Sequence, residues 1–164
     1  MVNDLYFLAE QLGNRLKTYG YQLVTAESCT GGWIAQAITE IPGSSVWFDR
    51  GFVTYSNNAK VKMLGVSQQT LNQYGAVSAE TAQQMAAGAL MNSEADCAIA
   101  VTGIAGPDGG SLEKPVGTVF VAWQCKNGPV LIEKLQLSGT RHEIREQTVR
   151  LAMDGLINLL APSN

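Results

Sequence analysis

A serine in a glycine-rich segment is the first side chain that could carry chemistry. Ser28 lies in Thr25-Ala-Glu-Ser-Cys-Thr-Gly-Gly32, which joins a predicted strand to a predicted helix. A serine hydroxyl attacks a carbonyl carbon once a neighbouring base has taken its proton. Gly31 and Gly32 let a ligand approach the backbone closely, and the N–H groups from Thr30 onwards favour a developing oxyanion. The segment fits a nucleophile beside an oxyanion site, although an ordinary strand-to-helix turn has the same pattern.

Two side chains could supply the base that such a serine needs. Tyr55 and Lys60 lie five residues apart across a second predicted strand-to-helix turn. A lysine acts as a base when burial or a cationic neighbour lowers its pKa, and a tyrosine can relay the proton. Taken alone, Lys60 also fits a solvated helix residue, and Tyr55 fits a core aromatic of a strand.

Two arginines and one long loop are candidates for binding the substrate. Arg141 and Arg145 are four residues apart at the start of the last predicted helix, where cations oppose the helix dipole unless an anion lies nearby. A phosphate would satisfy them, and a solvated pair is the alternative. The connection that begins at Thr102 and Gly103 and ends at Pro115 holds four glycines and two prolines. Its length favours a loop that covers a substrate.

Two alternative nucleophiles stay open. Ser45 follows Pro42 and Gly43, and a right-handed crossover would put it at the far end of the sheet from Ser28. It would then act only if the segment 46–52 folds back, or in the site of a neighbouring subunit. Cys29 could instead attack with His142 as its base, because a helix N-terminus lowers the pKa of a thiol.

The elements that must position these residues alternate between helix and strand. Periodicity and capping signals predict helices at 4–19, 33–40, 56–63, 79–92 and 140–160, and strands at 21–26, 46–55, 96–102, 116–124 and 130–137. This order predicts one domain over residues 1–164, a three-layer α/β/α fold with a five-stranded mixed, mostly parallel sheet. Ligands of such sheets bind beyond the carboxyl ends of the parallel strands, where Ser28, Tyr55 and Thr102 are expected to meet Arg141.

Composition argues against several classes of protein. The chain has 164 residues, 46% of them apolar and 15% charged, which is typical of a folded domain. No apolar run approaches the roughly 18 residues that a transmembrane helix needs. The net charge of −3 offers no basic surface to nucleic acid. A single histidine gives no basis for a zinc site, so no metal is expected. For the reasons just given, no membrane or nucleic-acid partner is expected either.

The three cysteines indicate a reducing compartment. Cys29, Cys97 and Cys125 have no spacing of a metal site or of a disulfide framework. Cys97 and Cys125 lie in apolar, strand-like runs and are expected to be buried, unreacted thiols. The amino terminus also lacks a signal-peptide pattern, and both features predict a cytoplasmic protein.

Several segments, read together, resemble the C-terminal domain of the competence-damage-inducible protein CinA. They occur in the family's order over about residues 5–160: Thr25–Gly32, Gly43–Ser45, Gly51–Asn57 with Lys60, Gly75–Ser78, Gly103–Gly110 and Lys114–Thr118. Members that consist of this domain alone are nicotinamide-nucleotide amidases. Larger relatives carry an added N-terminal domain, for which this chain has no room, so the stand-alone form is expected.

The resemblance implies hydrolysis of the carboxamide of nicotinamide mononucleotide to nicotinate mononucleotide and ammonia, in pyridine-nucleotide recycling. It implies a five-stranded mixed sheet, no metal or organic cofactor, and a serine–lysine site in which the lysine is Lys60 and the assisting tyrosine is Tyr55. The serine is Ser28 or Ser45, and the topology favours Ser28. Family members commonly self-associate, so a homo-oligomer is expected, with Trp47 and Phe48 either in its interface or in the core.

A different class of function remains as the alternative. The competence association of the larger relatives suggests a non-catalytic nucleotide-binding or competence-related interaction module. Release of ammonia from nicotinamide mononucleotide distinguishes the enzyme from this module, because a binding module would hold the nucleotide without turnover.

Overall fold

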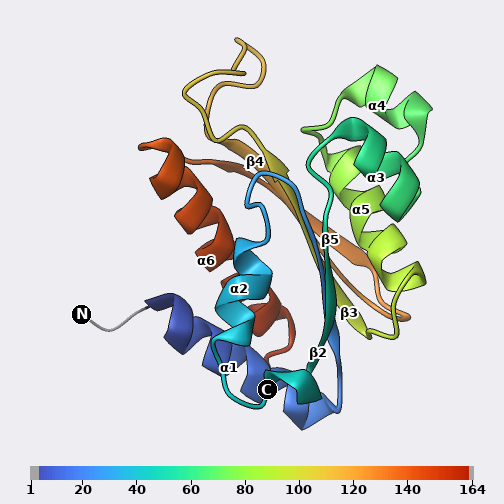
Figure 1. The fold of residues 1–164 in the computed structure, drawn as a ribbon, viewed down its shortest axis with the longest axis vertical. Helices are drawn as coiled ribbons and strands as arrows, with labels where there is room; N and C mark the ends of the chain where they lie inside the picture. The colour runs from blue at the N-terminus through green and yellow to red at the C-terminus, as the bar shows by residue number, and fades with distance from the viewer. Residues whose placement is uncertain (1–3, 163–164) are drawn as a thin grey trace.

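The computed structural model describes residues 4–162 of the chain (Figure 1). Within them, helices and strands alternate up to a final β-hairpin and a long helix. The strands are β1 (Leu23–Glu27), β2 (Phe48–Val53), β3 (Cys97–Gly103), β4 (Thr118–Cys125) and β5 (Val130–Gln136). The helices are α1 (Asp4–Tyr19), α2 (Trp33–Thr39), α3 (Asn57–Leu64), α4 (Gln68–Tyr74), α5 (Ala79–Met91) and α6 (Arg141–Leu159), with a 3₁₀ turn, η1, at Ser44–Val46.

The five strands form one mixed sheet in the order β2-β1-β3-β4-β5. β1 pairs in parallel with both β2 and β3, whereas β4 runs antiparallel to β3 and to β5. Only β4 among these strands therefore opposes the common direction. This confirms the mixed, mostly parallel five-stranded sheet predicted from the sequence.

Helices cover both faces of the sheet and give the three layers (Figure 1). On one face α1, α2 and α6 bury a cluster that includes Leu12, Ile38 and Met153. On the other face α5 lies on β1, β3 and β4, and α3 and α4 pack against α5. A side chain at Gly88 of α5 would collide with the backbone of Leu64, so a glycine there lets the two helices approach closely.

The main differences from the predicted elements lie around β2. The predicted strand at 46–55 is shorter, because residues before Phe48 form η1 and the chain leaves the sheet after Val53. Helix α4 was not predicted, although Ser67 caps it by accepting a hydrogen bond from the N–H of Thr70. A capping serine eight residues before Gly75 was the available signal.

The expectation of separate thiols at Cys97 and Cys125 is wrong, because the two residues form a disulfide. They are 28 residues apart in the sequence, yet the antiparallel register of β3 and β4 puts them directly opposite each other. Cys29 is a free, buried cysteine. Within residues 4–162, no helix is long and apolar enough to span a membrane, and no group of His, Cys, Asp and Glu side chains is placed to hold a metal ion.

Candidate active site

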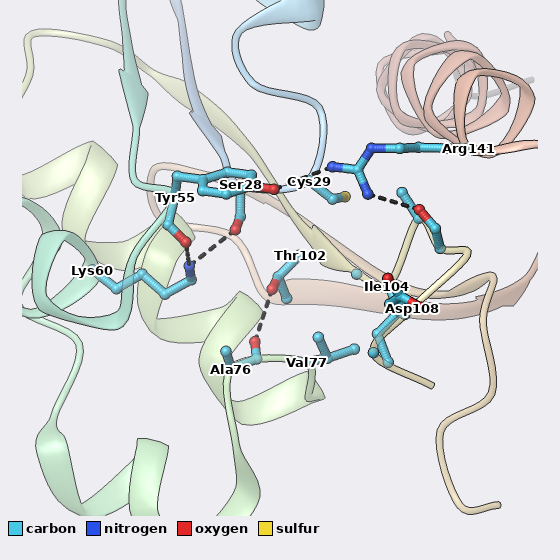
Figure 2. Close-up of a pocket in the computed structure, with 14 residues that line it drawn as sticks. Ser28, Cys29, Tyr55, Lys60, Ala76, Val77, Thr102, Ile104, Asp108 and Arg141 are labelled. Carbon is cyan, nitrogen blue, oxygen red and sulfur yellow. Dashed lines mark hydrogen bonds between the residues drawn. The ribbon is translucent and has the colours of Figure 1, made fainter. Parts of the chain in front are cut away.

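A cavity of about 260 Å³ lies beyond the carboxyl ends of β1 and β3 (Figure 2). Its walls come from the turns after β1, β2 and β3, from the start of α6 and from the loop after β3. Five side chains predicted from the sequence reach it: Ser28, Tyr55, Lys60, Thr102 and Arg141. They come from separate parts of the chain, and the sheet topology brings them together.

The central contact of the cavity joins a lysine to a serine. Nζ of Lys60 donates a hydrogen bond of 2.9 Å to Oγ of Ser28. The same Nζ donates to the carbonyl oxygens of Thr54, at 2.8 Å, and Tyr55, at 3.2 Å. Ser56 caps α3 through the N–H of Ala59, and this cap places Lys60 in the first turn of the helix. Ser28 is fixed in turn by its own N–H, which donates to the carbonyl of Val101 on β3.

Lys60 is buried without a carboxylate beside it. Only 1% of the residue is exposed, and the ion pairs formed within residues 4–162 involve other side chains. Burial lowers the pKa of Lys60, and the nearby thiol of Cys29 opposes this effect only in part. A lysine with a lowered pKa is a base for the hydroxyl that its amine already contacts.

The turn after Ser28 depends on two glycines with positive φ. Gly31 has φ +62° and Gly32 has φ +101°, a left-handed conformation that side chains rarely adopt. The N–H of Gly31 donates to the carbonyl of Ser28 and the N–H of Trp33 to that of Thr30. Of the donors expected between Thr30 and Gly32, the N–H of Thr30 is the one without a hydrogen bond to the described part of the chain. None of these three residues lines the cavity at Ser28; they line a shallower one beside it.

Tyr55 covers one side of the cavity and is 63% exposed. Its ring lies next to Ser28, and its hydroxyl accepts a hydrogen bond of 3.2 Å from Nη2 of Arg141 (Figure 2). Its backbone carbonyl accepts from Lys60. The hydroxyl therefore contacts the arginine rather than the amine or the serine.

The two arginines of α6 lie on different sides of the Ser28 turn. Arg141 lines the cavity, and its Nη1 donates to the carbonyl of Gly106 at 2.8 Å. Arg145 lies outside the cavity; its Nε and Nη2 each donate at 3.1 Å, to the carbonyls of Cys29 and Thr30 respectively. Its guanidinium also lies 5.4 Å from the centre of the Trp33 ring. Arg141 thus lines the cavity, whereas Arg145 lies outside it and binds the backbone of the turn.

The two alternative nucleophiles lie in different surroundings from Ser28. Ser45 is exposed in η1, which precedes β2, so it lies at the opposite end of the sheet. Cys29 lines the cavity, but burial raises the pKa of its thiol to about 12. His142 is exposed beside Trp33 and does not line that cavity. Ser45 therefore lies away from Lys60, and His142 is not placed to act as the base for Cys29.

Some residues of the cavity were not singled out from the sequence. Ala76 and Val77 line it from the loop before α5, and the hydroxyl of Thr102 donates to the carbonyl of Ala76 at 2.8 Å. Asp108 lines it from the loop after β3, and Gly103 lines it from the end of that strand. The segment Gly75–Ser78 was part of the family resemblance but had no assigned role. Two of its residues, Ala76 and Val77, form part of the cavity wall.

Comparisons with known proteins agree with this architecture. The model of the CinA C-terminal domain family matches residues 5–160. The nicotinamide-nucleotide amidohydrolase PncC of Escherichia coli (strain K12) is 51% identical over 154 residues, which cover 94% of this chain and 93% of that protein. A putative competence-damage inducible protein of Caldicellulosiruptor saccharolyticus is 51% identical over 93% of this chain but only 37% of its own length.

A solved structure has the same fold. The competence/damage inducible protein CihA from Agrobacterium tumefaciens superposes with a TM-score of 0.94 at 53% identity, over 97% of both chains. The family match covers nearly the whole chain, and these relatives share about half of their aligned residues with it. This protein therefore belongs to the CinA C-terminal domain family.

Proposed function

We propose that this protein hydrolyses the carboxamide of nicotinamide mononucleotide to nicotinate mononucleotide and ammonia, in pyridine-nucleotide recycling. The observation that carries the proposal is the hydrogen bond of 2.9 Å between a buried lysine, Lys60, and Ser28 in an open cavity. A serine with a neighbouring amine base is equipped for acyl transfer. The substrate is suggested by relatives named nicotinamide-nucleotide amidohydrolase, with 51% and 57% identity to this chain.

The reaction begins with proton transfer from Ser28 to the neutral amine of Lys60. The Oγ attacks the carboxamide carbon, and the carbonyl oxygen becomes an oxyanion. The protonated Lys60 then gives its proton to the departing nitrogen, so ammonia leaves and an ester joins Ser28 to the nicotinoyl group. Water, deprotonated by Lys60, attacks the ester. As the ester bond breaks, Lys60 returns that proton to Oγ of Ser28, and nicotinate mononucleotide leaves.

Binding of the nucleotide is assigned to the other side chains of the cavity. Arg141 supplies the cation for the 5′-phosphate, because its guanidinium faces the cavity. Arg145 is not assigned to the phosphate, since it does not line the cavity and binds the carbonyls of Cys29 and Thr30. Tyr55 assists by holding Arg141 and by closing one side of the site, and Thr102 and Gly103 form the opposite wall.

The test is ammonia release from nicotinamide mononucleotide by the purified protein. Lys60→Met keeps a similar volume but removes the base, and we expect it to abolish turnover while the protein stays folded. Lys62→Met is the matched control, because Lys62 lies on the same helix but is exposed. A stable complex of wild-type protein and nucleotide without ammonia release would favour a non-catalytic binding module instead.

We also infer that the protein self-associates and acts in the cytoplasm. Val53, at the carboxyl end of the edge strand β2, and Val46, just before its amino end, are both exposed, and a second copy packed along β2 would cover them. Trp47 is not available for such an interface because it is buried. Light scattering tests the first inference. For the second, detection of the protein after fractionation of the cell tests whether it lies in the cytoplasm.

A further inference from the structure

A buried carboxyl group lies directly before the proposed nucleophile. Glu27 is the last residue of β1 and is fully buried. Its Oε1 accepts hydrogen bonds from Oγ1 of Thr30, at 2.7 Å, and from the N–H of Ile34, at 2.8 Å. Its Oε2 accepts from the N–H of Ala35 at 3.0 Å. The ion pairs formed within residues 4–162 do not include Glu27, so backbone and hydroxyl donors satisfy it rather than a cation.

These contacts cap α2 from a distance. The residue before α2 is Gly32, which has no side chain to accept a hydrogen bond from the first turn. The helices α3, α4, α5 and α6 are capped locally by serine or threonine. A local cap would satisfy the same donors without burying an acidic group, which is costly even when it is hydrogen-bonded. Capping alone therefore does not explain why Glu27 occupies this position.

Glu27 also joins the two halves of the proposed catalytic pair. Its peptide bond leads directly into Ser28, and its carbonyl accepts a hydrogen bond of 2.9 Å from the N–H of Thr54. The carbonyl of Thr54 accepts in turn from Nζ of Lys60. The side chain of Glu27 meanwhile holds Thr30, two residues after the nucleophile. One residue thus contacts both the segment that holds the amine and the turn that holds the serine.

The turn is held from its other side by Arg145. A guanidinium can only donate hydrogen bonds, and that of Arg145 donates to the carbonyls of Cys29 and Thr30. In a trans peptide the carbonyl and the following N–H point in opposite directions, so the N–H of Thr30 points away from Arg145. With its side chain bound to Glu27 and both adjoining carbonyls bound to Arg145, Thr30 has little freedom to turn.

We propose that Glu27 is a positioning residue for the reaction: its carboxyl group fixes Thr30 and α2, so that Ser28 stays within reach of Lys60. The inference rests on the proposed function for its substrate. Burial raises the pKa of Glu27 and the hydrogen bonds from Thr30, Ala35 and Ile34 oppose that rise. The placement of Ser28 can nevertheless be measured without that substrate.

Glu27→Gln is the direct test, with Glu40→Gln as the matched control on α2. The amide oxygen of glutamine can still accept from Thr30 and Ile34, but its NH₂ group would face the N–H of Ala35 and lose that bond. We expect kcat to fall about tenfold or more with KM for nicotinamide mononucleotide nearly unchanged, because positioning acts on the transition state. Glu40 is exposed and remote from the cavity, so its variant keeps wild-type constants.

A substrate-independent measurement separates this inference from the proposed function. The rate at which a fluorophosphonate labels Ser28, located by mass spectrometry, is expected to fall in Glu27→Gln by a factor similar to that of kcat. If wild-type protein releases no ammonia yet still labels faster than the variant, the substrate assignment fails and the role of Glu27 stands. A wild-type protein that neither turns over nor labels at Ser28 would overturn both.

A purely structural role gives a different pattern. It would lower the melting temperature of Glu27→Gln while kcat per folded molecule and the labelling rate stay at wild-type values, and that result overturns the proposal. If Glu27→Gln does not fold, Thr30→Val removes only the hydroxyl contact and leaves the N–H groups of α2 capped. It is then expected to lower kcat and labelling together, and unchanged values in that variant would contradict the inference.

Discussion

The two ends of β1 and β3 differ in what they bury. At the amino ends, Leu23 and Cys97 lie in an apolar core, and Cys97 is bonded to Cys125 across the sheet. At the carboxyl ends, the same sheet buries Glu27 and Lys60, neither of which has an oppositely charged partner within residues 4–162. Buried polar groups oppose folding unless they are fully hydrogen-bonded. The comparison indicates that the amino ends serve stability, and that the carboxyl ends carry chemistry at the expense of stability.

The largest effect expected at the carboxyl ends is the dependence of activity on pH. Lys60 must be neutral to act as a base, so kcat/KM should fall about tenfold for each pH unit below the pKa of Lys60. Because burial lowers that pKa, the acid-side fall (limb) of the kcat/KM profile should lie below the ordinary pKa of lysine. A rate profile on the wild-type protein and on Lys62→Met measures it. A limb at the ordinary lysine pKa in both proteins would contradict a buried base.

The same shift links the site to stability. Between the lowered pKa and the ordinary one, the unfolded chain binds a proton at Lys60 that the folded protein does not. The free energy of unfolding should therefore rise with pH through that window. Denaturant titrations of wild-type protein and Lys60→Met over this range test the sign, since the variant should lack the rise.

Substitution of Arg145 is expected to have the next largest effect on activity. Arg145→Met removes both donors to the carbonyls of Cys29 and Thr30. We expect kcat to fall about 10²-fold, because a small displacement of the nucleophile is costly, while KM changes little. Steady-state kinetics measure the split. A rise in KM with unchanged kcat would instead assign Arg145 to the substrate.

Substitution of Arg141 should give the opposite split. Arg141→Met removes the cation that faces the cavity, so KM for nicotinamide mononucleotide should rise about tenfold or more with a smaller change in kcat. The substrate analogue without the phosphate, nicotinamide riboside, should show no such difference between variant and wild type. An equal penalty for both substrates would show that Arg141 acts through Tyr55 and not on the phosphate.

The smallest effect on activity is expected at the amino ends of the strands. Removing the disulfide in Cys97→Ala/Cys125→Ala should lower stability by about 3.5 kcal/mol in the chain-entropy estimate for 28 residues. Well below the melting temperature, kcat and KM should remain at wild-type values. Thermal melts with and without dithiothreitol provide a second readout, because Cys29 is already free. A melting temperature that does not respond to the reductant would contradict the disulfide.

The same comparison explains which features could be predicted from the sequence. Apolar runs and caps were sufficient to predict the sheet. The convergence of Ser28, Tyr55 and Thr102 followed from the rule that parallel strands share their carboxyl edge. The disulfide was missed because it depends on the exact register of β3 against β4, which periodicity does not specify. Nor could spacing separate Arg141 from Arg145, since both lie on one helical face and only the three-dimensional position of the Ser28 turn distinguishes them.

The role of Glu27 could not be predicted from the sequence either. Its place beside Ser28 was visible, but an acidic residue at the end of a strand has no fixed partner in the sequence. Its contacts with Ile34 and Ala35 arise only because the turn at Gly31 and Gly32 brings the start of α2 back towards β1. Such contacts require the folded turn.

The most direct test of the account is a comparison of two serine variants. Ammonia release from nicotinamide mononucleotide would be measured for Ser28→Ala and Ser45→Ala under the same conditions, with circular dichroism to verify that both are folded. The account predicts that Ser28→Ala loses all turnover above background, whereas Ser45→Ala keeps the wild-type rate. Substantial turnover by Ser28→Ala, or loss of turnover only in Ser45→Ala, would contradict the Ser28–Lys60 site.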